Sequence, residues 1–541
     1  MSLCFKKYAK WKSLFERNHR AFERVWIFRC TLDKFINRRS PFYGKLCYFH
    51  CSFNWWRSNN RRIDHLYWHD TNCACIFHYR YDHSSHCRRL CLYNKIFSPA
   101  LGFIGNASYL VTTVPIYMGV TVVTLVSFGF APLFTYWGVV LHNSMFTQLA
   151  NSIQSPYITL LIGGGLTALV GSLPIFGYKV FKLANSLVIP LVLIASVIIL
   201  ILLVLTPRTS ALSALNQFAN NVTLVQAINV WGASYNSPPP SITSFINTLA
   251  LNPLYIVGLS YVFSVIYIAG EVRQVNKNIP LAMLTTLAIY TFILIASTAL
   301  SYHTFSYTFL SNLYTLSIDY GRSPFPVIPY LTFLAAIISR NIYISSFIFI
   351  VVIIQLLWYQ MSGVFLGSRL LISYSLDRIL PNFFADINER FHTPIKAIIV
   401  TIILTLIGAV FFVLPVTAGI ALLLSAAGIA LILIFPITIV GFSLLFYRIK
   451  RREEFEKSIV RNSIFGGRAY YVIAIGTIVY SLFVFSEYIT VPAIFGYAGM
   501  MGIDLIIIPP IILFTLYYIT KYINIKRGVP VDLIFKQIPP E

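Results

Sequence analysis

The chain has 541 residues, of which 57% are hydrophobic and only 11% are charged. Soluble globular domains carry roughly 25% charged residues, so this composition excludes an ordinary water-soluble enzyme. The net charge is +23 and all eight cysteines lie before residue 92, which indicates that two stretches of different composition are joined in one chain.

Residues 1–97 form an atypical basic segment rich in Cys, His and Trp. Up to residue 98 the chain has 19 Lys and Arg against 6 Asp and Glu, with seven of the ten histidines and five of the eight tryptophans. Gly44 is the only glycine there, and no apolar run is long enough to cross a bilayer.

Two interpretations of this segment follow from its residues. Thiolate and imidazole suit Zn²⁺, so one is a zinc-binding module. Its candidate ligands are Cys73, Cys75, His78, His83, His86, Cys87 and Cys91. The lack of paired CxxC or HxxxH elements argues against a metal site. The second interpretation of residues 1–97 is a basic arm that binds anionic lipid or nucleic acid, although Trp and Cys are unusual in a disordered tail.

Ten apolar runs follow, each with at most one charged residue. A bilayer core about 30 Å thick needs about 20 residues at a rise of 1.5 Å, and lipid cannot satisfy backbone polar groups, so such runs must be helices. The runs lie at residues 108–140, 156–176, 183–206, 252–270, 281–302, 343–366, 397–415, 417–447, 469–489 and 498–519. The sequence predicts an all-α polytopic membrane protein, with about ten spans in residues 98–520 and a tail at 521–541.

The Lys and Arg residues between the runs predict the orientation. Of the 22 that follow residue 98, 19 fall on one side of the predicted spans, while Arg208, Arg322 and Arg340 fall on the other. Cytoplasmic loops carry an excess of Lys and Arg. The 19-residue side and the C-terminal tail are therefore predicted to be cytoplasmic.

The longest loop on the predicted outer side covers residues 207–251. It contains the Pro-rich stretch Ser237–Ser241 and the tripeptide Asn221-Val222-Thr223. The tripeptide has the form of an N-glycosylation sequon, a pattern that also arises by chance.

Ionisable side chains are nearly absent from the spans, where they are costly and usually mark a functional path. Glu487 and Asp504 lie near outer span ends, and Glu271 lies at an inner end. No His–carboxylate pair, metal-ligand spacing or nucleophile–base arrangement is present in the runs. The pattern disfavours an intramembrane enzyme. It favours binding of a small zwitterion through hydroxyl, amide and backbone groups at a broken helix.

Two segments at inner span ends carry recognisable motifs. Glu271 precedes a short basic stretch and Asn278-Ile279-Pro280. Ser368-Arg369-Leu370-Leu371 precedes Asp377, Leu380-Pro381 and Thr393-Pro394. Each motif alone is also an ordinary helix end with a turn proline. In this order and topology, the chain from about residue 94 to 541 resembles the amino acid–polyamine–organocation superfamily, specifically its amino acid permeases.

Two further stretches are similar to that family, and one position differs. Phe176-Gly177-Tyr178-Lys179 resembles the turn between its fourth and fifth helices, and Ser98–Gly105 resembles the entry into its third. Val275 stands where the family usually has Pro.

The resemblance implies the five-plus-five inverted-repeat transporter fold, in which the first and sixth helices are broken at the bilayer midplane. Exposed N–H groups there would hold a substrate carboxylate, and free carbonyls would hold its amino group. By position, the break in the sixth helix should lie at the predicted substrate-binding residues Ser260, Tyr261, Val262, Phe263 and Ser264. Glu271, Arg369 and Asp377 would be gate or connector charges.

The predicted function is that of a secondary active transporter, a permease that moves amino acids or related amines across the cytoplasmic membrane by alternating access. The expected partners are the substrate and membrane lipid, without nucleic acid. No cofactor and no resident metal are expected, and H⁺ and Na⁺ are the candidate coupling ions. The alternative is a non-transporting or defective membrane protein derived from such a permease.

The family has twelve helices, and the two that are missing here are the first and second. This suggests a third interpretation of residues 1–97, an out-of-frame translation of those helices. Codons for Leu, Ile, Val, Phe and Met share a central T, and a one-base shift that moves it to first place yields Phe, Leu, Ser, Tyr, Cys and Trp. These types crowd the segment. Its length also fits two helices of about 20 residues with their loops.

We predict that the gene, shifted by one base, encodes a Gly-containing apolar helix that leads into Ser98. Sequencing the gene and translating both alternative frames tests this directly. If neither frame encodes two apolar runs, the frameshift interpretation is wrong.

Overall fold

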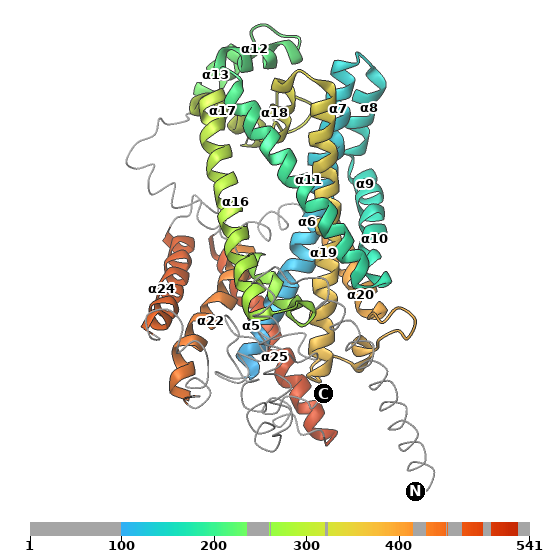
Figure 1. Cartoon of the computed structure of the whole chain (residues 1–541), viewed down its shortest axis with the longest axis vertical. Helices are drawn as coiled ribbons and strands as arrows, with labels where there is room; N and C mark the ends of the chain where they lie inside the picture. Colours follow the sequence, from blue (N-terminus) through green and yellow to red (C-terminus); the bar gives the residue numbers. More distant parts are fainter. Residues whose placement is uncertain are drawn as a thin grey trace, which may run out of the picture. The chain divides into compact units, whose positions relative to one another are not determined.

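Figure 1 shows the chain as a computed structural model. The structure describes residues 99–234, 259, 261–319, 323–414, 429–450, 452, 468–490 and 499–528. All of these belong to one unit of the chain, Thr71–Glu541, and they form helices without any strand. The expectations for residues 1–97 lie outside the described residues.

The first span is a helical stretch of 41 residues, Ala100–Val140. It consists of α5 (Pro99–Val111), the π-helical η1 (Thr112–Met118), α6 (Gly119–Thr124), the π-helical η2 (Leu125–Phe130) and α7 (Ala131–Val140). At a rise of 1.5 Å this stretch is about 60 Å long, so it extends beyond the hydrocarbon core. Pro115 lies inside η1, where its missing N–H removes one helical hydrogen bond and favours the wider turn.

Five further helices are long and apolar enough to cross a membrane. Their bounds are Pro156–Phe176, Tyr178–Leu205, Lys277–Phe305, Ile342–Leu376 and Ile395–Val413. The first is built from α9 (Pro156–Thr159), η3 (Leu160–Gly164), α10 (Gly165–Gly171) and η4 (Leu173–Phe176), and the others correspond to α11 (Tyr178–Leu205), α16 (Val275–Phe305), α19 (Ile342–Leu376) and α20 (Ile395–Val413). With the first span, they confirm six of the ten predicted runs.

The other four predicted runs are described only in part. The run at 252–270 is not a long α-helix, because from Tyr261 it is the 3-10 helix η5 (Tyr261–Glu271). The last three runs contain α22 (Ile429–Lys450), α24 (Arg468–Thr490) and α25 (Gly499–Lys526). The apolar parts of α22 and α24 within the described residues are shorter, Pro436–Ile449 and Tyr470–Ser486.

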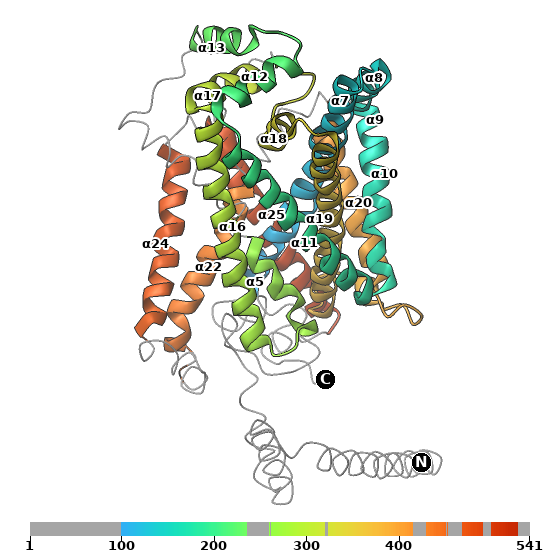
Figure 2. The ribbon, with the colours of Figure 1, turned by 45° about the horizontal axis from the view of Figure 1, so that its top comes forward.

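Short helices cover one end of the bundle. They are α8 (Ser144–Ile153), α12 (Arg208–Phe218), α13 (Leu224–Ser234), α17 (Tyr307–Tyr314) and α18 (Leu331–Ser339). They lie together in both Figure 1 and Figure 2. Arg208 donates to the carbonyls of Tyr302 and His303, and Arg340 donates to the carbonyl of Ser210, so two of the three predicted outer arginines tie loops together at this end.

The loops predicted to share the opposite side do meet at the other end. Thr393 Oγ1 donates to the carbonyl of Ile175 at 2.8 Å, and the rings of Phe176 and Phe391 are 5.8 Å apart. Asn524, near the end of α25, donates to the carbonyl of Arg378 at 2.6 Å. The alternation of charged loops therefore predicted correctly which connectors share an end.

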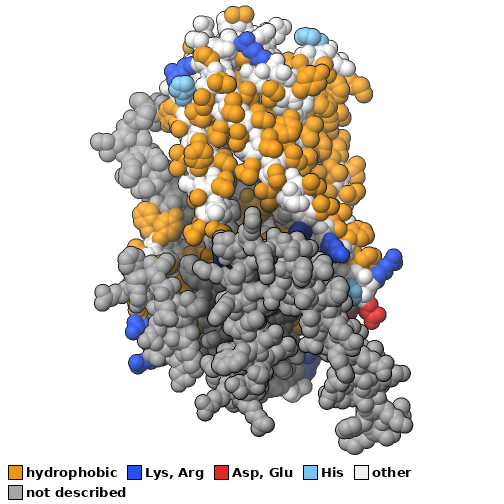
Figure 3. Space-filling view, viewed as in Figure 1, with side chains coloured by type: hydrophobic (Ala, Val, Ile, Leu, Met, Phe, Trp, Pro, Cys, Tyr) orange, Lys and Arg blue, Asp and Glu red, His pale blue; other side chains and the backbone are white. Residues whose placement is uncertain are grey.

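The sides of the bundle are apolar. Figure 3 shows hydrophobic side chains over the helical face, with Lys and Arg near its two ends. On α16, large apolar side chains such as Leu284, Phe292 and Ile295 are more than 60% exposed. An exposed apolar belt between polar ends is expected of helices that face lipid.

Glycines allow α20 to approach the first span closely. A Cβ built on Gly119 would lie 2.7 Å from the carbonyl carbon of Gly408, and one on Gly408 would overlap the carbonyl oxygen of Pro115. Small residues at helix contacts let backbones pack directly in membranes, where the hydrophobic effect does not drive helices together.

We predict that Gly408→Ala destabilises the bundle by about 1–3 kcal/mol or more, because the new methyl group overlaps backbone atoms that cannot move independently. Thermal unfolding in detergent measures the effect. Gly165→Ala is the matched control, since a Cβ there meets nothing within 4 Å. Equal unfolding midpoints for the two variants would contradict this packing.

Candidate functional site

The predicted break in the sixth helix falls on an irregular backbone. From Tyr261 to Glu271 the chain forms a 3-10 helix of 11 residues. Such helices rarely exceed 3–4 residues because their hydrogen bonds are poorer, and a long one inside a span often marks a hinge or a functional site. The structure thus departs from α-helix where the resemblance predicted a break.

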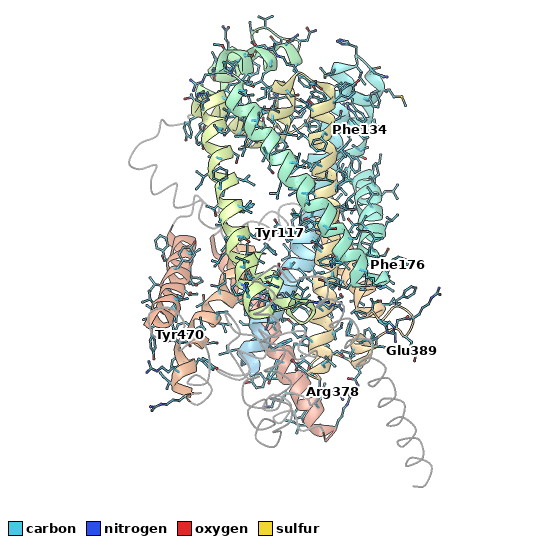
Figure 4. All side chains as sticks on the ribbon, in the orientation of Figure 1. Tyr117, Phe134, Phe176, Arg378, Glu389 and Tyr470 are labelled. Carbon is cyan, nitrogen blue, oxygen red and sulfur yellow. The ribbon has the colours of Figure 1, made fainter. Side chains whose placement is uncertain are left out.

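Aromatic side chains from three elements meet at this backbone. The Tyr261 ring lies 5.0 Å from the ring of Tyr117 on η1, and Tyr117 lies 5.3 Å from Tyr359 on α19. Tyr109 on α5 lies 6.1 Å from Tyr261 and 5.3 Å from Phe263. We call Tyr109, Tyr117, Tyr261 and Tyr359 the tyrosine cluster. Figure 4 shows Tyr117 between the two ends of the bundle marked by Phe134 and Arg378.

Several buried polar atoms around the cluster have no hydrogen-bond partner. They include the hydroxyls of Thr113, Tyr261 and Ser362 and the Oε1 atom of Gln360. The hydroxyls of Thr113 and Tyr359 are polar neighbours of the Tyr261 hydroxyl, yet Tyr261 has no partner in good geometry. Buried polar groups are nearly always paired, so these atoms need a partner such as ordered water or a bound ligand.

A hydrogen bond near the tyrosine cluster connects the π-helical turn η1 to α19. Gln360 Nε2 donates to the carbonyl of Met118, the last residue of η1, at 3.0 Å. Thr121 Oγ1 donates to the carbonyl of Tyr117 at 2.8 Å. Side chains therefore satisfy carbonyls at the π-helical end, which explains how this backbone is stable in lipid.

The five predicted substrate-binding residues differ in their burial and contacts. Tyr261 and Phe263 belong to the aromatic contacts described above, and Phe263 is buried. Val262 and Ser264 are half-buried in the first turns of η5. Ser260 lies outside the described residues.

Of the three predicted gate or connector charges, Arg369 and Asp377 can be placed with their side chains. Glu271 is the last residue of η5. The Arg369 guanidinium lies over the Phe365 ring, 4.6 Å from its centre, in the half of α19 that ends before Asp377. Asp377 directly follows α19.

Asp377 lies in a tight turn that closes α19. The backbone N–H of Asp377 donates to the carbonyl of Ser373, and Ser375 Oγ donates to the carbonyl of Pro381 at 2.8 Å. The Oδ2 atom of Asp377 is buried without a hydrogen-bond partner, and burial raises the pKa of the Asp377 carboxyl to about 7. At neutral pH it is therefore close to half protonated.

A comparison with protein families identifies the chain. The amino acid permease family model matches residues 92–534, most of the sequence. The chain belongs to the amino acid permease family. A search of curated proteins finds no match. The family is one of transporters, so this permease is a multi-pass membrane transporter for amino acids.

Sequence reasoning missed most of the tyrosine cluster in this permease. Tyr109, Tyr117 and Tyr359 are indistinguishable by type from the other tyrosines and phenylalanines of the spans. Two signals were available, Pro115 inside an apolar run and Gln360 inside another. Within the described residues, no group of three or more His, Cys, Asp or Glu side chains could hold a metal ion.

We predict that Asp377→Asn stabilises the permease at pH 8 and leaves it nearly unchanged at pH 4. The folded carboxyl keeps its proton up to about pH 7, whereas the unfolded one ionises near 3.8, so wild-type stability falls as pH rises between these values. One pKa unit is worth ~1.4 kcal/mol, which allows a difference of up to about 4 kcal/mol.

Unfolding midpoints at several pH values measure this effect. Asp386→Asn is the control, because Asp386 forms an exposed ion pair with Lys396. Such a pair contributes little to stability. A difference between Asp377→Asn and wild type that does not change with pH would contradict the buried, raised-pKa carboxyl.

Proposed function

We propose that this permease moves amino acids or related amines by alternating access, with the substrate bound at the tyrosine cluster. The observation that carries the proposal is the meeting of two irregular helices, η1 and η5, at buried polar atoms without partners. Both irregular segments lie within apolar spans, where each unpaired polar group is costly unless a ligand uses it.

The chemistry of the cluster suits a zwitterion. An amino acid brings a carboxylate that needs donors and an ammonium that needs acceptors. The hydroxyls of Tyr261 and Thr113 can donate, and Gln360 Oε1 can accept. The faces of the tyrosine rings attract an ammonium group when it is desolvated.

Alternating access requires that the site opens to one side at a time. Glu271 is the last residue of η5, Arg369 lies near the end of α19 and Asp377 directly follows it, so all three lie at the ends of elements that carry the cluster. We assign them to the inner gate and its connectors. Asn524 of α25 binds the carbonyl of Arg378 in the same turn, which links a further helix to this gate.

We infer that the end carrying Arg378 and Asn524 faces the cytoplasm and that the membrane is the plasma membrane. The support for this orientation is the distribution of Lys and Arg, 19 against 3 after residue 98. H⁺ and Na⁺ are the candidate coupling ions, and we propose no cofactor.

We also propose that residues 1–97 replace the first two helices of the family by a shift of reading frame. The family match begins at residue 92, which is compatible with this proposal. In that case the alternative applies to the chain with residues 1–97 as they stand, a non-transporting form derived from such a permease, and the proposed transport belongs to the frame-restored chain.

Uptake of radiolabelled amino acids into proteoliposomes tests the function. We expect uptake by the frame-restored chain and none by the printed chain. Uptake by the printed chain would overturn the account of residues 1–97. The absence of uptake of every amino acid by both chains would overturn the proposed function.

In the transporting chain, we predict that Tyr261→Phe raises the KM for uptake about tenfold. A hydrogen bond to a charged group is worth about 1.5–3 kcal/mol, and ~1.4 kcal/mol corresponds to a factor of ten. The unfolding midpoint should change little, because the contacts of this hydroxyl with Thr113 and Tyr359 are outside good hydrogen-bond geometry.

Tyr343→Phe is the matched control, since Tyr343 is 83% exposed at the start of α19. If Tyr261→Phe lowers stability and leaves the KM unchanged, the hydroxyl has a structural role and the proposed site is wrong.

A further inference from the structure

The short loop between α12 and α13 presents an asparagine to solvent at the end of the bundle opposite Arg378. Its residues Asn221, Val222 and Thr223 are all exposed, and Val222 is 86% exposed. Figure 2 shows both helices at this end of the bundle. An exposed Asn-x-Thr tripeptide outside the membrane has the two properties that N-glycosylation requires, the sequence and access.

The loop holds its shape without using the amide nitrogen of Asn221. Asn216 Nδ2 donates to the carbonyl of Val222 at 2.8 Å, and Asn216 Oδ1 accepts from the N–H of Val225 at 3.0 Å. The N–H and the hydroxyl of Thr223 both donate to Asn221 Oδ1, at 3.1 and 3.0 Å. Both hydrogen bonds of the Asn221 side chain are thus made by its oxygen, and Nδ2 makes none with the described residues.

The hydroxyl of Thr223 also has a chemical consequence for that nitrogen. An amide nitrogen is a poor nucleophile because its lone pair is delocalised into the carbonyl. When a bond forms at Nδ2 and a proton leaves it, negative charge develops on Oδ1. Two donors already directed at Oδ1 stabilise that charge.

We propose that Asn221 is an N-glycosylation site of this permease. The donor would be an oligosaccharide linked to a polyprenyl diphosphate. A bond forms between Nδ2 and the anomeric carbon of the sugar. The bond from that carbon to the phosphate oxygen breaks with its electron pair, and one Nδ2 proton passes to a base. This inference rests on the proposed orientation, which places the loop outside the cell.

The chain contains a second tripeptide of the same form, which provides an internal control. Asn106-Ala107-Ser108 lies within α5, and Asn106 is only 1% exposed. Its Nδ2 donates to the carbonyl of Gly102 at 3.3 Å, and its Oδ1 accepts from Tyr267 at 3.1 Å. The same motif there has neither access nor a free nitrogen, so we expect no modification.

Mass spectrometry of the protein from the membranes of its own cells tests the proposal. We expect the peptide with Asn221 to carry an added glycan mass and the peptide with Asn106 to carry none. Thr223→Ser should keep the modification, whereas Thr223→Val should abolish it. Asn221→Asp is the sharpest variant, because its carboxylate can still accept both bonds from Thr223 while Nδ2 is lost.

A labelling experiment separates this inference from the orientation on which it rests. A membrane-impermeant thiol reagent applied to intact cells carrying Val222→Cys should label the peptide that contains residue 222. If that peptide is labelled while wild-type Asn221 is unmodified, the glycosylation proposal is wrong and the orientation stands. If it is labelled only after the cells are opened, both are wrong.

Discussion

Hydrocarbon offers no hydrogen bonds, so every backbone N–H and C=O within the bilayer must find a partner inside the protein. This constraint explains why the spans are helices, and it also makes each departure from the α-helix informative. In α19 the α-helical hydrogen bonds continue without a break over 35 residues. In the first span it changes to π-helix twice, and the stretch after residue 260 becomes a 3-10 helix. A protein that retains such segments in lipid must compensate for them, and Gln360 and Thr121 show how, by donating to carbonyls at the end of η1.

The irregular segments are not scattered. η1 supplies Thr113 and Tyr117, η5 supplies Tyr261, and all three lie in one neighbourhood with unpaired hydroxyls. A packing defect would be expected to place a void or a water among these groups, whereas a binding site places a ligand there. The absence of charged side chains from the cluster is consistent with a substrate whose two charges are met by dipoles, since a fixed buried charge would need a permanent partner.

The sequence predicted what depends on composition and could not predict what depends on contacts. Six apolar runs were located correctly because twenty apolar residues have one stable arrangement in lipid. The loops that contain Ile175, Arg378 and Thr393 lie at one end of the bundle, as the distribution of Lys and Arg between the runs predicted. The tyrosine cluster did not follow, because the chain has 34 Tyr and 43 Phe and only the fold shows which of them meet. The raised pKa of Asp377 has the same origin, since the burial that raises it is a property of the folded chain and cannot be read from the sequence.

The unbroken α19 connects the candidate site with the turn that contains Asp377. Tyr359 and Asp377 are 18 residues apart on this helix and the turn that closes it, a distance of about 27 Å at 1.5 Å per residue. Gly363 and Gly367 of the same helix pack against Met118 and Thr401, so α19 contacts both η1 and α20 along this length. A straight helix can transmit a small rotation at one end to the other, whereas the first span can change shape at its π-helical turns. If a substrate binds at the tyrosine cluster, as proposed, α19 would carry the Asp377 turn with it while η1 and η5 adjust, a division of roles that fits the proposed alternating access.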